Sequence, residues 1–353
     1  MKTNFSYLNN KLIPVDTFFE KALFDKNSGY YSKKIAFGAK GDFITAPYIS
    51  NLFSEIIGIW VVSTWYKLGK PKNFNFVELG PGDGSLTKVL LDTFEKFSEF
   101  NKATNIFLYE RSELLKNLQK NKIKNTKVRW LRNLQKIKKG PIIFFGNEFF
   151  DAIPIKQFLK KNDLFFEKCY VLNNNRKWNE VYKKASEKNI SIIKSFRTLK
   201  NLEFIEYPKL GFKELEKIKK KISKLSGGIL LIDYGYLGSN NSNTLQSIKK
   251  NKKNKLLENI GSADVTSLVN FNLLKEYFLK SNLKVKKIVS QKFFLERMGI
   301  IERANILKRN MSVKEKANLN SRLFRLLHKK MMGNLFKVIF AFKSKKTNFL
   351  GFK

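Results

Sequence analysis

A glycine-rich turn follows the first apolar strand that the sequence predicts, at residues 73–79. Residues 78–84 read ELGPGDG and lead directly into a predicted helix. Glycines here let the backbone turn tightly and approach a ligand over the carboxyl end of the strand and the helix N-terminus. A dinucleotide site would need glycine at the first, third and sixth positions, but the sixth position counted from Gly80 is Ser85. The alternative is a tight turn that binds no ligand.

The spacing Gly-x-Gly-x-Gly, with a glutamate two residues before it, is typical of the first motif of S-adenosylmethionine-dependent methyltransferases. We expect Gly80 and Gly82 to make room for the amino-acid and ribose parts of that cofactor, with Gly84 completing the turn. Glu78 would anchor the turn or bind the methionine ammonium group through water. Glu110 ends a second predicted strand, where an acidic side chain in doubly wound folds accepts the ribose hydroxyls. These five residues are therefore candidate cofactor ligands.

Two carboxylates follow the next strong strand. Residues 147–154 read NEFFDAIP, so Glu148 and Asp151 enclose two phenylalanines. In a methyltransferase this loop faces the transferable methyl group, and acids beside aromatic rings suit a cationic acceptor such as a guanidinium. We therefore predict Glu148 and Asp151 as catalytic residues and Asn147 as a cofactor contact. The alternative is that the rings belong to the core and the acids cap a helix.

Two further acids lie where strands or loops are expected to end near the same crevice. Asp233 ends another apolar strand in the segment DYGY, residues 233–236, and Asp264 lies in GSADVT, residues 261–266, before a predicted helix. Acids at strand ends point into the crevice of such folds, so both are candidate catalytic residues in a supporting role. For Asp264 the alternative is a helix N-cap.

The counts of cysteine and histidine exclude several kinds of chemistry. The 353 residues include one cysteine, Cys169, and one histidine, His328, so an intrachain disulfide and the usual Cys/His zinc site are excluded, and no metal is predicted. The net charge of +40 could indicate a polyanion partner. Lysines are spread along the whole chain, however, as an A/T-rich genome would produce. This pattern favours solvated surfaces over a nucleic-acid or acidic-protein contact.

From residue 74 onward, short apolar strands alternate with helices, which predicts a doubly wound, mostly parallel α/β sheet covered on both faces. The predicted strands cover residues 73–79, 105–111, 141–148, 227–235, 284–291 and 336–344. The predicted organisation is a helical N-terminal cap region (1–70), a methyltransferase core (71–158 and 206–345), an inserted β-hairpin subdomain (159–205) and a basic tail (346–353).

The most apolar stretch, residues 56–65, is far shorter than the roughly 20 residues that a membrane span needs. No signal or transit pattern is seen at the N-terminus. We therefore expect a soluble protein of a bacterial cytoplasm.

Seven blocks of the sequence resemble those of the MidA-like methyltransferases, a family that includes the mitochondrial complex I assembly factor that acts on arginine. The blocks run in the family's order through nearly the whole chain. They are GDFITAP (41–47), ISNLFSEIIGIW (49–60), FVELGPGDGSL (76–86), NEFFDAIPIKQF (147–158), DYGY (233–236), GSADVTSLVNF (261–271) and FLERMGI (294–300). The resemblance implies a class I methyltransferase (Rossmann-like) fold, S-adenosylmethionine as cofactor, and arginine methylation of a respiratory complex I subunit.

The chain departs from the family's pattern at several positions. The family usually has Glu where Tyr48 stands, Arg where Asp83 stands, and His where Asn147 and Tyr236 stand. A downstream Arg and His are missing around residues 246–253. If those histidines help to orient or deprotonate the acceptor, their replacement would reduce activity. The glycine turn matches the family's pattern in its glycines.

Three hypotheses follow. The first is a protein arginine N-methyltransferase, in which segment 41–47 and the next helix cover the cofactor and form one wall of the substrate channel; simple packing is the alternative for that segment. The second is an RNA methyltransferase, motivated by the charge of +40. The third is a non-catalytic assembly chaperone that retains the fold, motivated by the altered histidine positions. The acceptor protein, the number of methyl groups and the oligomeric state are not determined by the sequence.

Overall fold

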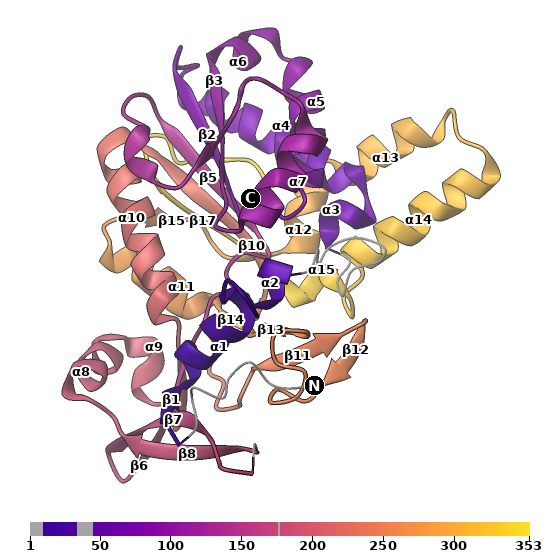
Figure 1. Ribbon diagram of the computed structural model, residues 1–353. Helices are drawn as coiled ribbons and strands as arrows, with labels where there is room; N and C mark the ends of the chain where they lie inside the picture. The colour runs from indigo at the N-terminus through magenta and orange to yellow at the C-terminus, as the bar shows by residue number, and fades with distance from the viewer. Residues whose placement is uncertain (1–9, 34–44, 176) are drawn as a thin grey trace.

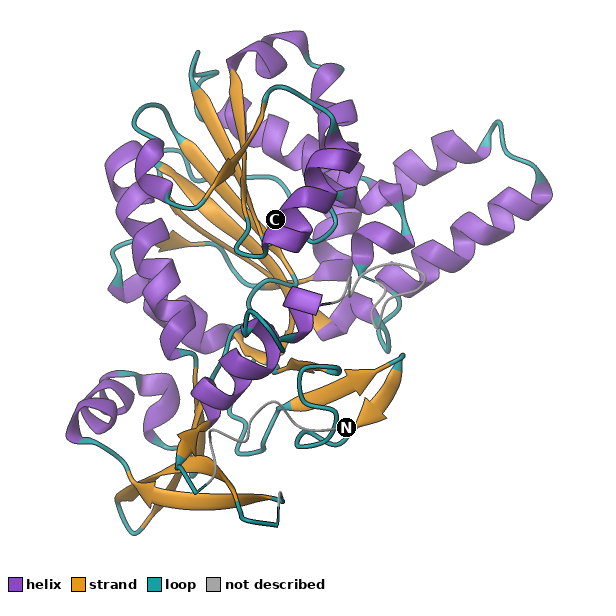
Figure 2. Ribbon diagram, in the orientation of Figure 1, coloured by secondary structure: helices purple, strands orange, loops and turns teal. Residues whose placement is uncertain are grey.

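A twisted central sheet organises the chain in the computed structural model, which describes residues 10–33, 45–175 and 177–353 (Figures 1 and 2). The strands lie in the order β15-β17-β10-β5-β2-β3-β4. Strands β10, β5, β2, β3 and β4 are parallel, and β17 runs antiparallel to β10. Their bounds are β2 Phe74–Leu79, β3 Thr104–Tyr109, β4 Val128–Leu131, β5 Ile142–Asn147, β10 Gly227–Tyr236, β15 Lys284–Val285 and β17 Phe336–Lys343. The predicted fold class, a mostly parallel doubly wound α/β sheet, is confirmed.

The predicted strand at residues 284–291 is wrong in its extent. Two short pieces pair with β17, namely β15 and β16 (Val289–Ser290), and between them the Lys286 N–H donates a further bond to the Phe340 carbonyl at 3.0 Å. The segment is lysine-rich and half-exposed, as is common at the edge of a sheet, where charged side chains discourage further pairing. The sequence pattern showed the apolar residues but not that they lie at an edge.

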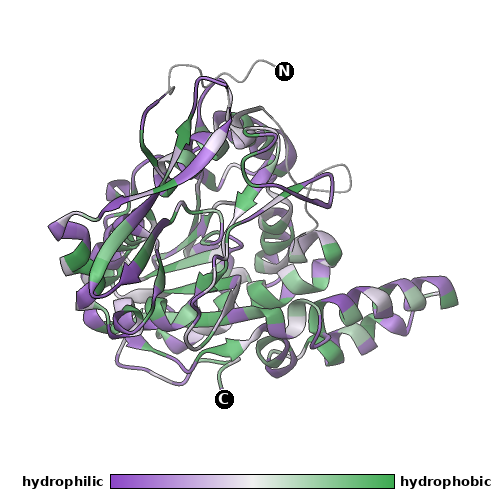
Figure 3. Ribbon diagram, turned by 90° about the horizontal axis from the view of Figure 1, so that it is seen from below, coloured by the Kyte–Doolittle hydropathy of each residue, from purple (hydrophilic) through white to green (hydrophobic). Residues whose placement is uncertain are grey.

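Helices cover both faces of the central sheet because successive side chains of each strand point to opposite sides. On β5, Ile143 and Phe145 pack toward one face, and Ile142 and Phe144 toward the other. The first face is covered by α4 (Asn51–Lys67) and α5 (Ser85–Glu95), together with helices near the C-terminus. The second is covered by α10 (Lys209–Leu225) and α11 (Phe271–Lys280). Figure 3 shows the hydrophobic strands enclosed between these layers.

A second, antiparallel sheet lies beyond the carboxyl ends of the central strands (Figure 1). The hairpin predicted within residues 159–205 is present as β7 paired with β8. It belongs to a larger sheet of order β1-β7-β6-β9, and two helices that the sequence pattern did not reveal, α8 and α9, lie between β8 and β9 in the chain. The elements are β1 Ile13–Pro14, β6 Lys156–Lys161, β7 Leu164–Leu172, β8 Trp178–Lys184, β9 Phe204–Tyr207, α8 Glu187–Ser195 and α9 Arg197–Lys200.

The N-terminal region is less helical than the sequence suggests. It contains α1 (Val15–Phe24), the single turn α2 (Tyr30–Lys33) and the single turn α3 (Ala46–Ile49) before α4 begins. The predicted helical region is interrupted at Ser50, whose backbone is extended and whose hydroxyl accepts the Leu52 N–H at 3.2 Å as the N-cap of α4. Residues 41–44 of the segment expected to cover the cofactor lie outside the described residues.

Two helices at the C-terminal side, α13 and α14, project beyond the rest of the molecule (Figures 1 and 3). The terminal residues 346–353 pack against the core, as the burial of Phe349 and Phe352 shows. Among the residues that the structure describes, no helix is both long and apolar enough for a membrane span. The remaining elements are α6 Ser98–Ala103, α7 Glu113–Ile123, η2 Leu134–Lys136, β11 Gln246–Lys249, β12 Lys252–Asn254, β13 Asp264–Thr266, β14 Val269–Asn270, α12 Gln291–Arg297, α13 Ile300–Lys308, α14 Val313–Leu327 and α15 Met332–Leu335.

Candidate functional site

The glycine turn between β2 and α5 has a backbone that favours glycine at three positions. The φ angles of Gly80, Gly82 and Gly84 are +61°, +57° and +81°, in the left-handed region that other residues adopt only at a cost. A Cβ atom added to Gly80 would lie 3.0 Å from Cδ2 of Phe149, which comes from the loop after β5. The backbone of the turn therefore carries no side chain on the side that faces this loop.

Replacing Gly80 by alanine is expected to weaken S-adenosylhomocysteine binding roughly tenfold. A left-handed backbone costs an L-residue about 1–2 kcal/mol, and the methyl group would press on Phe149. Calorimetric titration measures the effect. Gly238→Ala is the matched control, since Gly238 has φ +93° but open space around it. Equal affinity in the Gly80 variant and the native protein would contradict the role of the turn.

Glu78 lies at the end of β2 and is buried. Its Oε2 accepts the hydroxyl of Thr87 on α5 at 2.5 Å, so the carboxyl joins the strand to the helix across the glycine turn. Burial raises the pKa of Glu78 to about 7. Of the two roles predicted for Glu78, the structure shows contacts that suit the anchoring one.

Glu110 follows β3 directly and faces the same turn. Its Oε1 accepts the Ser112 N–H at 2.8 Å, and its Oε2 lies 3.4 Å from Nε2 of Gln119. Gln119, on α7, also donates to the carbonyl of Gly82 at 2.7 Å. Burial raises the pKa of Glu110. Gln119 therefore connects two candidate cofactor ligands; the sequence analysis missed it, because a lone glutamine within a helix carries no motif.

Asn147, the last residue of β5, has a buried side-chain oxygen for which the described residues provide no hydrogen-bond donor. Its Nδ2 donates to Oε1 of Glu148 at 3.1 Å. A buried acceptor without a partner is costly and rare in a finished interior. A polar nucleoside with an amino-acid group fits the donors and acceptors present here. They are the backbone of the glycine turn, the carboxyls of Glu78 and Glu110, and this oxygen.

The loop after β5 is held in an unusual conformation by Asp233. Glu148 has φ +51°, and its N–H donates to the carbonyl of Ile232 at 2.9 Å. The Oδ2 atom of Asp233 accepts the N–H groups of Phe150 at 2.7 Å and Asp151 at 3.3 Å. Asp233 is fully buried. The prediction that its carboxylate points into the crevice is therefore wrong. The strand continues to Tyr236, and the carboxylate instead binds backbone N–H groups of the loop.

The carboxyls of Glu148 and Asp151 are partly buried and close enough to affect each other. Burial and then the charge of Asp151 raise the pKa of Glu148 to about 7. Burial raises the pKa of Asp151 to about 7 as well. Burial and the charges of Asp151 and Glu148 also raise the pKa of Asp233. Such shifts mark groups that can accept a proton near neutral pH.

The two phenylalanines between the acids have different surroundings. Phe150 is buried in the core below the loop and contacts Gly211 of α10, so the expectation that it encloses a cation is wrong. Phe149 is only partly buried and lies against the glycine turn. The alternative of a helix cap is also excluded, because no helix begins at residues 148–151.

Asp264 approaches this loop from a strand, β13, rather than from a helix N-terminus, so the N-cap alternative is wrong. It is buried, and its Oδ2 accepts the hydroxyl of Tyr31 at 3.4 Å. Burial, followed by the charges of Asp264 and Asp151, raises the pKa of Tyr31. Tyr31 therefore lies within electrostatic range of both acids. In the sequence Tyr31 belongs to the aromatic pair of GYYSKK (29–34), which matches no motif.

Two departures from the family's pattern meet in space. Asp83, in the glycine turn, forms an ion pair with Lys122 and accepts the Ser85 hydroxyl at 2.8 Å. The Lys122 ammonium also lies 5.8 Å from the ring centre of Tyr48. Burial and a hydrogen bond to Asp83 raise the pKa of Tyr48. The changed residues at positions 48 and 83 therefore form one local cluster beside the turn.

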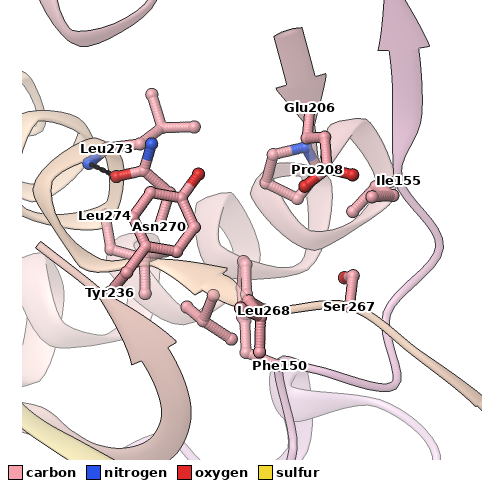
Figure 4. A pocket seen from close by; sticks show the side chains of 11 residues that line it. Phe150, Ile155, Glu206, Pro208, Tyr236, Ser267, Leu268, Asn270, Leu273 and Leu274 are labelled. Carbon is pink, nitrogen blue, oxygen red and sulfur yellow. Dashed lines mark hydrogen bonds between the residues drawn. The ribbon is translucent and has the colours of Figure 1, made fainter. Parts of the chain in front are cut away.

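A small cavity lies behind the loop that follows β5 and carries Glu148 and Asp151 (Figure 4). Its lining includes Phe150, Tyr236, Ser267 and Asn270, and its volume of about 20 Å³ suits roughly one water molecule. The side-chain oxygen of Asn270 accepts the Leu273 N–H at 3.0 Å as the N-cap of α11. The cavity is too small for a nucleoside or a guanidinium, so the glycine turn and the acids beside it remain the candidate site.

The fold and the site define a class I methyltransferase architecture, and comparisons with known proteins agree. The family described as "Putative S-adenosyl-L-methionine-dependent methyltransferase" matches residues 56–289. The chain belongs to this family; it is an S-adenosylmethionine-dependent methyltransferase, with that molecule as its cofactor.

Individual relatives extend over most of the chain. The protein arginine methyltransferase NDUFAF7 homolog of Caenorhabditis elegans is 32% identical over 303 residues, covering 78% of this chain and 70% of the relative. Protein arginine methyltransferase NDUFAF7 of Xenopus laevis is 29% identical, covering 84% and 72%. A crystal structure from Burkholderia thailandensis, with bound S-adenosyl-homocysteine, superposes with a TM-score of 0.82 at 20% identity, covering 96% of this chain and 90% of the other. The structural likeness confirms the fold.

Proposed function

We propose that this enzyme transfers methyl groups to arginine side chains of a protein. The observation that carries the proposal is the pair Glu148 and Asp151, both with a pKa of about 7, beside the glycine turn. Acidic groups that can be deprotonated at neutral pH suit a cationic acceptor. The names of the relatives, protein arginine methyltransferases, support the same acceptor.

The residues of the turn would hold the cofactor. The bare backbone at Gly80, Gly82 and Gly84 would admit its amino-acid and ribose parts, and Glu110 would accept the ribose hydroxyls. The free oxygen of Asn147 would accept a further donor. When bound, S-adenosylmethionine supplies an activated methyl group.

Glu148 and Asp151 would act on the acceptor. An ordinary guanidinium has a pKa above about 12, so its nitrogen needs help to release a proton. The carboxylate of Glu148 would orient the nitrogen and accept the proton that leaves as the new carbon–nitrogen bond forms. Asp233 contributes indirectly, by fixing the backbone of the loop that carries both acids. Asp264 would support Asp151 together with Tyr31, whose hydroxyl donates to Asp264 and whose pKa is raised by burial and by the charges of both acids.

We further propose that the acceptor is a subunit of a respiratory complex I and that the enzyme works in a bacterial cytoplasm. The resemblance to the family of the complex I assembly factor supports the first part. The lone, buried Cys169 is compatible with a reducing compartment. Incubation with labelled S-adenosylmethionine and an extract of the source cells, followed by mass spectrometry, tests both acceptor and residue. Label on RNA, or on no macromolecule at all, would contradict the proposal.

The rate of methyl transfer is expected to rise with pH, to reach half of its maximum at about pH 7, and to level off at higher pH. Carboxyls with raised pKa values hold their protons below that pH and can act as bases only above it. The rate should change close to tenfold per pH unit well below the midpoint. Single-turnover assays with an arginine peptide between pH 5.5 and 9 measure this, with the cofactor at saturating concentration. A flat profile would argue against carboxylate bases.

A further inference from the structure

A surface pocket between α7, β4 and η2 collects positive charge. Its volume is about 290 Å³, and Lys116, Lys120, Arg132 and Lys136 line it together with one acid, Glu113. Lys116 is buried, so this ammonium group forms part of the floor. The volume is close to the lower end of the range of about 300–1,000 Å³ for small-molecule sites.

The single acid does not neutralise the pocket. Glu113 pairs with Lys116 at 2.9 Å and with Arg132 at 2.6 Å. Within the described parts of the chain, Lys120 and Lys136 form no ion pair with a carboxylate, so the pocket keeps an excess of cations. Positive groups held close together repel one another, and a bound anion would relieve that repulsion.

An aromatic ring forms one wall of the pocket. Trp130 of β4 is partly exposed, and the ammonium of Lys120 lies 5.9 Å from its ring centre. The indole N–H donates to Oε1 of Gln119 at 2.8 Å, which fixes the orientation of the ring. Gln119 in turn bonds the carbonyl of Gly82, so it separates this pocket from the cofactor turn.

We propose that this pocket binds a phosphate monoester that carries a flat ring, a mononucleotide-like ligand, at a site separate from the cofactor. A phosphate monoester carries about −1.5 to −2 charges at pH 7 and suits Arg and Lys donors. The ring would lie against Trp130, as bases stack on aromatic side chains. This inference does not depend on the identity of the methyl acceptor.

The test uses the full chain saturated with S-adenosylhomocysteine, so that the cofactor site is filled. Uridine 5′-monophosphate should bind with one-to-one stoichiometry by calorimetry at constant ionic strength, and should bind more tightly than inorganic phosphate or uridine. Lys120→Gln/Lys136→Gln should weaken binding roughly tenfold or more. The control Lys220→Gln/Lys255→Gln removes the same charge from exposed positions and should change affinity less than twofold.

A second readout locates the ligand. Binding should change the tryptophan fluorescence of the native protein, and Trp130→Phe should abolish that change. Nucleotide binding that occurs only without S-adenosylhomocysteine would show a shared site and overturn the proposal, as would the absence of saturable binding under both conditions. Tighter binding of long RNA, weakened equally by both double variants, would show a diffuse basic surface instead and would also overturn it. Inorganic phosphate binding as tightly as the nucleotide would refute the role of the ring.

Discussion

Replacing Glu148 by glutamine will lower the rate of methyl transfer about a thousandfold while leaving cofactor affinity within about threefold of the native value. A positioned general base contributes typically 10²–10⁴ in rate, and glutamine has the same shape but cannot take up a proton. The backbone should tolerate the change, because the N–H of residue 148 keeps its bond to the Ile232 carbonyl. Single-turnover transfer to an arginine peptide and calorimetry with S-adenosylhomocysteine measure the two quantities.

The matched control for that variant is Glu99→Gln. Glu99 is well exposed and pairs with Lys70 far from the glycine turn, so its loss should change neither rate nor affinity. The residual activity of Glu148→Gln should also lose most of its rise between pH 6 and 8. Equal turnover in the variant and the native enzyme would remove Glu148 from the mechanism. A parallel fall in cofactor affinity would assign it to binding instead.

Replacing Lys156 by methionine is expected to lower the free energy of unfolding by about 3–5 kcal/mol. The buried Lys156 ammonium lies 3.0 Å from Oδ1 of Asp16 on α1 and also pairs with Glu167 on β7. Without it, two buried carboxylates face each other, and Lys183, 3.7 Å from Glu167, is the cation that still pairs with one of them among the described residues. The second sheet and α1 would loosen together. Urea unfolding followed by circular dichroism measures the loss.

Lys160→Met on the same strand is the control for Lys156→Met. Lys160 pairs with the exposed Asp163, so its replacement should cost less than about 1 kcal/mol. Equal unfolding midpoints for the two variants would show that the ion pairs contribute little.

Much of the site could be predicted from the sequence because parallel strands bring their carboxyl ends to one edge of a sheet. Glu78 lies at the end of an apolar strand, and Gly80, Glu110 and Glu148 each come just after one. Their neighbourhood in space therefore follows from their positions in the chain. The positive φ angles of the three glycines also agree with the motif. Local pattern was enough for these residues.

The tertiary structure decided which of the other predicted groups face the crevice. Asp233 turns out to hold backbone N–H groups more than 80 positions away in the chain, and Phe150 lies in the core. Gln119 and Tyr31 join the site through contacts that no motif encodes. A strand that continues three residues past Asp233, and a loop that turns back onto it, determine where these side chains point. Strand patterns specify which segments pair, but the direction of a single side chain depends on packing between segments distant in sequence, which one-dimensional periodicity does not contain.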